Sequence, residues 1–194
     1  MVATFDVMYD WGGTDTAPAN QTDVDGLGPP TLRFKNADDA TIDTNNKLVV
    51  PAAATKYSFW KHIYIRCSAA DSHTMNNFRF YTDGAASFGD AGIDVKVGLQ
   101  FPVRTSGPVY TGYEVANADE ELAAGHGGIT SVASAFDYSA IGDSLTISCS
   151  EAGSIVNAAN ETTNYLLMQM TVASTVIIAG DLPNETGTIA YDEA

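Results

Sequence analysis

Residues 57–84 read YSFWKHIYIRCSAADSHTMNNFRFYTDG, two aromatic and β-branched runs joined by a polar link and closed by an Asp-Gly pair. In the first run the side chains alternate between two faces, as they do in a pleated strand. One face carries Lys61, Ile63, Ile65 and Cys67, and the other carries Trp60, His62, Tyr64 and Arg66. The stretch therefore predicts two strands of a sheet.

Strand-like segments recur along the rest of the chain, with turn residues between them. They are residues 1–9, 31–35, 47–52, 93–101, 109–116, 144–150, 165–173, 175–180 and 186–193. In the clearest one, residues 93–101, five apolar residues alternate with Asp, Lys, Gly and Gln. Many short strands of this kind predict an all-β fold, an antiparallel β-sandwich of the jelly-roll type or a barrel.

Two polar or small-residue stretches predict long connections within a single domain of residues 1–194. Residues 10–30 are glycine-rich and predict an N-terminal arm, and residues 123–143 predict a long loop or crossover. Residues 117–125, NADEELAAG, are the one place where acidic residues open an Ala-rich turn before a glycine, so we expect at most one short helix there.

The chain carries 24 Asp and Glu against nine Lys and Arg, a net charge of −15. Such a charge repels phosphate backbones and anionic bilayers, so we expect neither nucleic acid nor membrane as a partner. No signal peptide or apolar membrane span is evident. Cys67 and Cys149 each lie in an alternating run, where we expect free thiols that pack as small apolar groups rather than a disulfide.

Residues 142–145 spell Gly-Asp-Ser-Leu, a string that marks one family of serine esterases. A hydrolase needs a histidine directed at its serine. No histidine follows Ser144, and the three in the chain are His62, His73 and His126. We therefore interpret the string as a turn that enters a strand and expect no catalytic residue.

Acidic loops are the only candidates for a metal site, and they would hold Ca²⁺ or Mg²⁺. The candidate clusters are Asp83, Asp90 and Asp94, and Asp119, Glu120 and Glu121. Residues 23–28 do not fit a calcium loop of the EF-hand type, because Leu27 and Phe34 stand where ligands are needed. His62 has no second histidine at metal-ligand spacing, so we expect it to serve the structure. No other cofactor is indicated.

Loop positions carry two further features, glycosylation sequons and exposed aromatics. The sequons begin at Asn20, Asn160 and Asn184, and the aromatics that lie beside glycines are Trp11, Tyr110 and Tyr113. The aromatics have two interpretations, a platform that stacks on sugars and a part of the core, and core positions are the more common use.

Residues 57–84, with their Trp-Lys-x-Ile strand and the sequence NFRFYTDG, resemble a recurrent pattern in virion proteins of tailed viruses of bacteria and archaea. The C-terminal stretch, residues 165–194, resembles the closing strands of the same proteins, including its Gly-x-x-Pro-x-Glu-Thr turn and final Tyr-Asp-Glu. The resemblance implies a β-sandwich particle protein and assigns no residue a role.

The resemblance and the acidic surface together predict a non-enzymatic structural protein of the virion, of the capsid decoration, head-stabilising or turret type. Its partners would be further copies of itself, in a trimer or pentamer, and the major capsid protein or other virion proteins. Two alternatives remain open: a Ca²⁺-dependent carbohydrate-binding or adhesin module, and a head-tail connector or tail component. An edge strand at residues 186–193 would offer a route to assembly.

Overall fold

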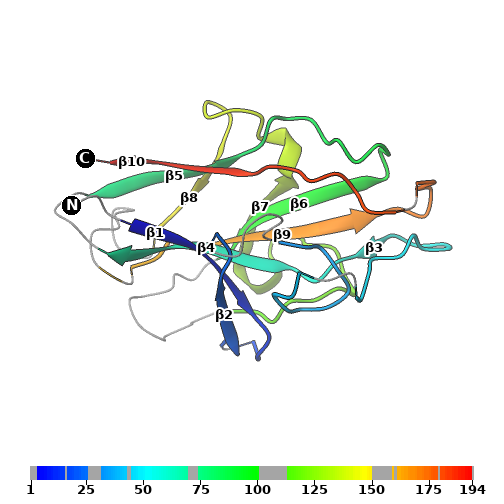
Figure 1. Ribbon diagram of the computed structural model, residues 1–194, viewed down its shortest axis with the longest axis horizontal. Coiled ribbons are helices and arrows are strands. Elements are labelled where there is room, and N and C mark those ends of the chain that lie inside the picture. The colour runs from blue at the N-terminus through cyan, green and yellow to red at the C-terminus, as the bar shows by residue number, and fades with distance from the viewer. Residues whose placement is uncertain are drawn as a thin grey trace.

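Two antiparallel β-sheets pack face to face in the computed structural model, with strands labelled in Figure 1. The structure describes residues 4–193 apart from 16, 26–31, 43–44, 70–73, 101–112, 150–158, 160 and 179. The large sheet has the order β2-β1-β4-β9-β6-β7, with β3 beside β9, and the small sheet has the order β10-β5-β8. The prediction of an all-β, antiparallel sandwich is confirmed.

The large sheet consists of β1 (Thr4–Trp11), β2 (Asn20–Asp23), β3 (Lys56–Tyr57), β4 (Lys61–Ala69), β6 (Ile93–Gln100), β7 (Ile129–Ser134) and β9 (Tyr165–Val172). The small sheet consists of β5 (Met75–Tyr81), β8 (Leu145–Ile147) and β10 (Thr188–Glu193). Two single-turn 3₁₀ helices, η1 (His126–Gly128) and η2 (Ala135–Asp137), flank β7.

The alternation in residues 60–67 places each side chain as predicted, but both faces of β4 are buried. Ile63, Ile65 and Cys67 point into the core between the two sheets. Trp60 and Tyr64 lie in a second cluster on the opposite, outer face of the large sheet. The alternation therefore separates two packed layers rather than an inside from an outside.

The core between the sheets is apolar and β-branched, as a sandwich interior requires. Strands β6 and β9 contribute their aliphatic faces from the large sheet, and Phe78 and Phe80 of β5 face them from the small sheet. Cys67 and Cys149 are both buried in this core as free thiols, as predicted.

The outer face of the large sheet is covered by residues 113–129, which run across β4, β9 and β6. Tyr113, Ala116 and Leu122 of this covering segment pack on Trp60 and Leu167 of the sheet. Within the described residues, this segment contains no helix of more than one turn, in agreement with the expectation of at most one short helix at residues 117–125.

Residues 117–125 form no helix because a buried side chain takes the backbone groups that a helix would use. The Gln169 Nε2 atom donates to the backbone oxygens of Asn117 and Glu120, at 3.5 and 3.0 Å. Its Oε1 atom accepts from the Leu122 backbone N–H at 2.6 Å. Residues 118–120 instead form bends, and Asp119 N donates a hydrogen bond to the Asn117 side chain just before them.

The two long connections predicted from composition contain strands. The expected arm of residues 10–30 includes the end of β1 and all of β2, which pair as a hairpin, and its last residues 26–30 lie outside the described residues. The expected loop of residues 123–143 includes β7, which pairs with β6. Gly98 permits this pairing, since a Cβ atom there would lie 3.1 Å from Val132 and 3.2 Å from Ile129.

Four segments predicted as strands are not strands where the structure describes them: residues 32–35, 47–52, 113–116 and 175–178. The first, second and fourth supply apolar side chains such as Phe34, Leu48 and Val176 to the core between the sheets. Each of these three segments buries part of its apolar surface without forming a strand, while Val49, Val50 and Ile177 are exposed. No helix in the described part of the chain is long and apolar enough to cross a membrane.

Candidate functional site

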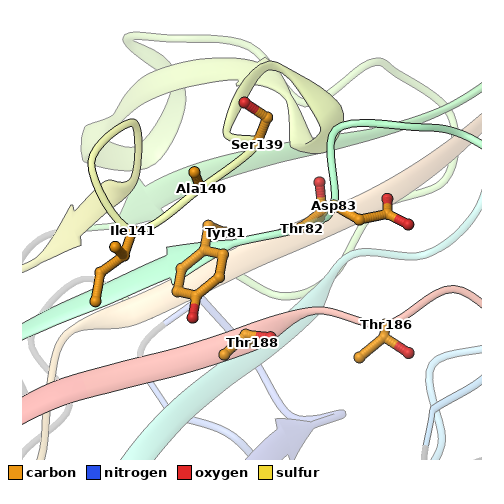
Figure 2. Close-up of a pocket in the computed structure, with 8 residues that line it drawn as sticks. All are labelled: Tyr81, Thr82, Asp83, Ser139, Ala140, Ile141, Thr186 and Thr188. Carbon is orange, nitrogen blue, oxygen red and sulfur yellow. The ribbon is translucent and has the colours of Figure 1, made fainter.

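An open groove of about 420 Å³ lies on the outer face of the small sheet, and Figure 2 shows the side chains around it. Its floor is made where Tyr81 at the end of β5 pairs directly with Thr188 at the start of β10. One wall is the loop that carries Ile141. The lining residues are Tyr81, Thr82, Asp83, Ser139, Ala140, Ile141, Thr186 and Thr188. Three separate parts of the chain therefore build it.

The floor and the loop wall are held together at Thr82. Its backbone N–H donates to the Tyr138 carbonyl at 2.7 Å, and its hydroxyl lies 3.2 Å from that same oxygen. The next turn depends on Gly84, which has a φ of +78° and approaches Ser139 so closely that a Cβ atom would lie 2.5 Å from the Ser139 Cβ. The groove is thus shaped by backbone contacts rather than by mobile side chains.

The Gly-Asp-Ser-Leu string forms a tight turn beside this groove. Asp143 N donates to the Ala140 carbonyl at 2.9 Å, and the Ser144 hydroxyl donates to the Ile141 carbonyl at 3.0 Å. The turn places Ile141 at its exposed tip, with 52 % of its surface accessible. His126 pairs with Glu114 and His62 is buried on the large sheet, while His73 lies outside the described residues. The turn interpretation therefore accounts for Ser144.

A second open groove, of about 650 Å³, runs between the loop of residues 84–94 and η2. Asp90 and Asp94 line it, but both carboxylates are already engaged. Asp90 accepts from the backbone N–H groups of Gly92 and Ile177, which lowers the pKa of its carboxyl. Asp94 accepts from the Ser134 hydroxyl at 2.7 Å and forms an ion pair with Lys96 at 3.1 Å. These acids stabilise the loop.

The acidic clusters do not assemble into a metal site in the part of the chain that the structure describes. Asp83 is not engaged with Asp90 and Asp94: its carboxylate accepts a hydrogen bond from the Ala85 backbone N–H in its own turn. Glu120 lies 3.3 Å from His126 Nε2 and accepts from the Asn117 side chain at 3.1 Å. A carboxylate used in this way stabilises the covering segment.

The outer face of the large sheet buries titratable groups among aromatic rings. His62 is fully buried, with its ring centroid 4.6 Å from that of Tyr113 and 5.4 Å from that of Tyr165. Asp10, directly opposite His62 in the strand register, accepts a 2.5 Å hydrogen bond from the Tyr165 hydroxyl. Burial lowers the pKa of His62 to about 3, against a raising contribution from the Glu114 backbone. The imidazole is therefore neutral at ordinary pH and packs among these aromatic rings.

A second buried network ties residues 35–41 to the end of the large sheet. The Lys61 Nζ atom donates to the Tyr9 hydroxyl at 3.0 Å, and that hydroxyl donates to Asp38 at 2.8 Å. Asp38 also accepts from the Gly12 backbone N–H at 2.6 Å. Burial lowers the pKa of Lys61 to about 8 and raises the pKa of Asp38. The network uses its hydrogen-bonding groups internally, so it anchors the connection of residues 35–41 to the end of the large sheet.

Of the two interpretations of Trp11, Tyr110 and Tyr113, the core position is the one that the structure shows for Tyr113, and no sugar-stacking platform of these residues forms among the described residues. Tyr113 is buried and donates to the Gly12 carbonyl at 2.9 Å, Trp11 donates to the Thr22 hydroxyl at 3.0 Å, and Tyr110 lies outside the described residues. The sequon asparagines Asn20 and Asn184 are exposed, and Asn160 lies outside the described residues.

The groove residues Tyr81, Ile141 and Thr188 were not singled out in the sequence. The only local signal is that an aromatic strand ends at an Asp-Gly turn, residues 83–84. The partners across the groove are about 60 and 100 residues further along the chain, so only the sandwich topology brings them together.

Comparisons with protein-family models, with curated proteins and with solved structures found no match to this chain. The arrangement of its own residues is therefore the basis for a functional proposal.

Proposed function

We propose that this protein is a non-enzymatic structural subunit of the virion of a tailed virus, on the outside of the capsid as a decoration, head-stabilising or turret protein. It assembles with copies of itself, as a trimer or pentamer, on a shell built by the major capsid protein or other virion proteins. The observation that carries the proposal is the edge strand β10, which offers a backbone ladder to a neighbouring subunit.

Among the described residues, strand β10 pairs with β5 on one side and ends the small sheet on the other. Its last three residues are exposed. An exposed strand edge presents backbone donors and acceptors that another chain can pair with, and both assembly and aggregation use this route. The Arg79–Asp192 ion pair, at 2.5 Å, helps to hold β10 in place for such pairing.

The distribution of titratable groups supports a structural role. The buried Asp10, Lys61 and His62 lie inside packed layers, where their contacts are with aromatic rings and backbone. A catalytic group has to reach a substrate, and these side chains do not line either groove. The net charge of −15 disfavours contact with packaged nucleic acid and so favours the capsid exterior.

The first experiment is the solution mass of the full chain by light scattering, at low and high salt and with and without EDTA. A closed trimer or pentamer supports the proposal, and its loss in EDTA would assign Ca²⁺ or Mg²⁺ a place between subunits. A chain that is monomeric under all of these conditions and also fails to bind capsid shells would overturn it.

A matched pair of variants tests the edge itself. Ala190 on β10 and Thr146 on β8 both pair with Arg79 of β5, from opposite sides. A lysine on an edge strand opposes pairing with another chain. Ala190→Lys should shift the oligomer toward monomer, whereas Thr146→Lys should leave it assembled. Deletion of residues 186–194 should have the same effect as Ala190→Lys, and an unchanged oligomer in both would contradict the edge as the route.

A further inference from the structure

The groove on the outer face of the small sheet combines an aromatic ring, an exposed aliphatic side chain and several hydroxyl groups. The half-buried Tyr81 ring lies between Ile141 and Thr188 in Figure 2. Ser139, Thr186 and Thr188 complete the lining, and in Figure 2 the Ser139 hydroxyl points away from the Tyr81 ring. Such a surface is apolar at the ring and able to hydrogen-bond around it.

We propose that this groove binds a neutral oligosaccharide, with the Tyr81 ring as its stacking surface. A pyranose ring has an apolar C–H face and a rim of hydroxyl groups, so it matches a tyrosine ring that has a threonine, Thr188, beside it in the same groove. Serine and threonine hydroxyls both donate and accept hydrogen bonds, as sugar hydroxyls do. Ile141, at the tip of the turn of residues 140–143, extends the apolar surface along the groove.

Charge selects a neutral sugar rather than an anionic one. Asp83 is exposed at one end of the groove, and one of its carboxylate oxygens is used by the Ala85 backbone N–H at 3.0 Å. The other oxygen of such a carboxylate accepts a hydrogen bond from a neutral hydroxyl group, but it repels a sulfate, phosphate or carboxylate on the ligand. The net charge of −15 acts in the same direction.

The groove is formed before any ligand arrives. Thr82 fixes the floor to the loop wall, and Gly84 sets the turn that carries Asp83 against Ser139. Its volume of about 420 Å³ lies within the range of roughly 300–1,000 Å³ that is usual for ligand sites. A site that is already shaped loses less conformational entropy on binding.

This inference is independent of the proposed assembly role. Subunit pairing would use the backbone edge of β10, whereas the groove uses the Thr188 side chain on the sheet face. A monomer that binds sugar but no capsid shell would support the groove and contradict the assembly role, and an oligomer that binds no sugar would support the assembly role and contradict the groove.

The test is saturation-transfer NMR on the full chain with three neutral hexasaccharides, built from glucose, mannose and N-acetylglucosamine, and with 3′-sialyllactose as the anionic comparison. We expect transfer to at least one neutral sugar at millimolar concentration and weaker transfer to the sialylated one. Absence of transfer to all three neutral sugars would overturn the proposal, and preference for the sialylated sugar would overturn its charge argument.

Variants then place the binding in the groove. Tyr81→Ala should lower the affinity for the sugar about fivefold to tenfold. Tyr81→Phe, which keeps the ring, should change that affinity by less than about threefold. Since Tyr81→Ala can disturb β5, Ile141→Asp at the exposed tip provides a second variant and should also weaken binding. Tyr57→Ala, at a half-exposed tyrosine on β3 of the other sheet, is the control. Equal affinity in Tyr81→Ala, Ile141→Asp and the control would place any binding elsewhere and overturn the proposal.

Discussion

The two faces of the large sheet are both buried, yet they are built from different chemistry. The face toward the small sheet packs aliphatic and phenylalanine side chains. The outer face packs Trp60, Tyr64, Tyr113 and Tyr165 around the fully buried His62, beneath the covering segment of residues 113–129. The inner face can be stabilised by burial alone, whereas the outer face also depends on protonation states and hydrogen bonds. The two layers should therefore respond differently to substitution and to pH.

The largest effect is expected on the inner face, from Phe78→Ala. Phe78 is fully buried and packs edge-on against Phe5 at a centroid distance of 6.2 Å. Removal of the ring loses transfer free energy and leaves a cavity, so the free energy of unfolding should fall by about 3–5 kcal/mol. Urea denaturation measures the change. Ile177→Ala, at a side chain that is 92 % exposed, is the control and should change stability by less than about 0.5 kcal/mol.

The next effect is a pH dependence specific to the outer face. His62 has a pKa of about 3 in the folded protein and an ordinary value of 6.5. Below pH 6.5 the unfolded chain binds a proton that the folded protein does not, so stability falls as the pH drops toward 3. Between pH 7 and pH 5 this histidine should lower the free energy of unfolding by about 2 kcal/mol.

Comparison with His62→Phe isolates that contribution from other groups. Phenylalanine keeps an aromatic ring against Tyr113 and Tyr165 but cannot take a proton. Chemical denaturation at pH 7 and pH 5 should therefore show a smaller pH dependence in the variant. Identical pH dependence in the two proteins would mean that His62 accepts its proton in the folded state.

A smaller effect is expected when one outer-face hydrogen bond is removed by Tyr165→Phe. The buried Asp10 loses the 2.5 Å hydrogen bond from the tyrosine hydroxyl, while the ring packing stays. Loss of the donor to a buried acceptor usually lowers the free energy of unfolding by about 1–3 kcal/mol. Thermal and urea unfolding measure the loss, with Tyr57→Phe on β3 as the matched control. A cost as small as that of the control would mean that this bond contributes little to the outer layer.

The strands with strong alternation could be predicted from the sequence. Residues 60–67 separate the two buried layers correctly, and residues 93–101 correspond to β6. Strand β7 was not recognised although it contains Ile129, Thr130 and Val132, because it is short and lies within a stretch rich in glycine and alanine, and it pairs with β6 beside Gly98. Residues 47–52 and 175–178 were predicted as strands from their apolar composition, but they form irregular backbone from which Leu48 and Val176 pack on the core while Val49 and Ile177 are exposed.

The candidate site was much less predictable than the fold. Tyr81, Ile141 and Thr188 have no motif in common, and they meet only because β5 pairs with β10 and the turn of residues 140–143 lies beside that pair. The acidic clusters were visible in the sequence, but their use depends on local hydrogen bonds such as those of Asp90 to Gly92 and Ile177. Residue type indicates the chemistry available, and backbone geometry decides whether it is already used.

The smallest effect should come from the part of the outer face that the covering segment leaves partly open. Asp6 of β1 and Arg66 of β4 are paired in the strand register and form an ion pair at 2.7 Å, with side chains 21 % and 28 % exposed. Asp6→Asn keeps the shape of the side chain and removes the charge, so the free energy of unfolding should fall by less than about 1 kcal/mol. The difference should shrink further in high salt, because solvent ions screen partly exposed pairs. A drop in the free energy of unfolding as large as that of Tyr165→Phe, unchanged by salt, would show that this end of the outer face is as shielded from solvent as the layer around His62.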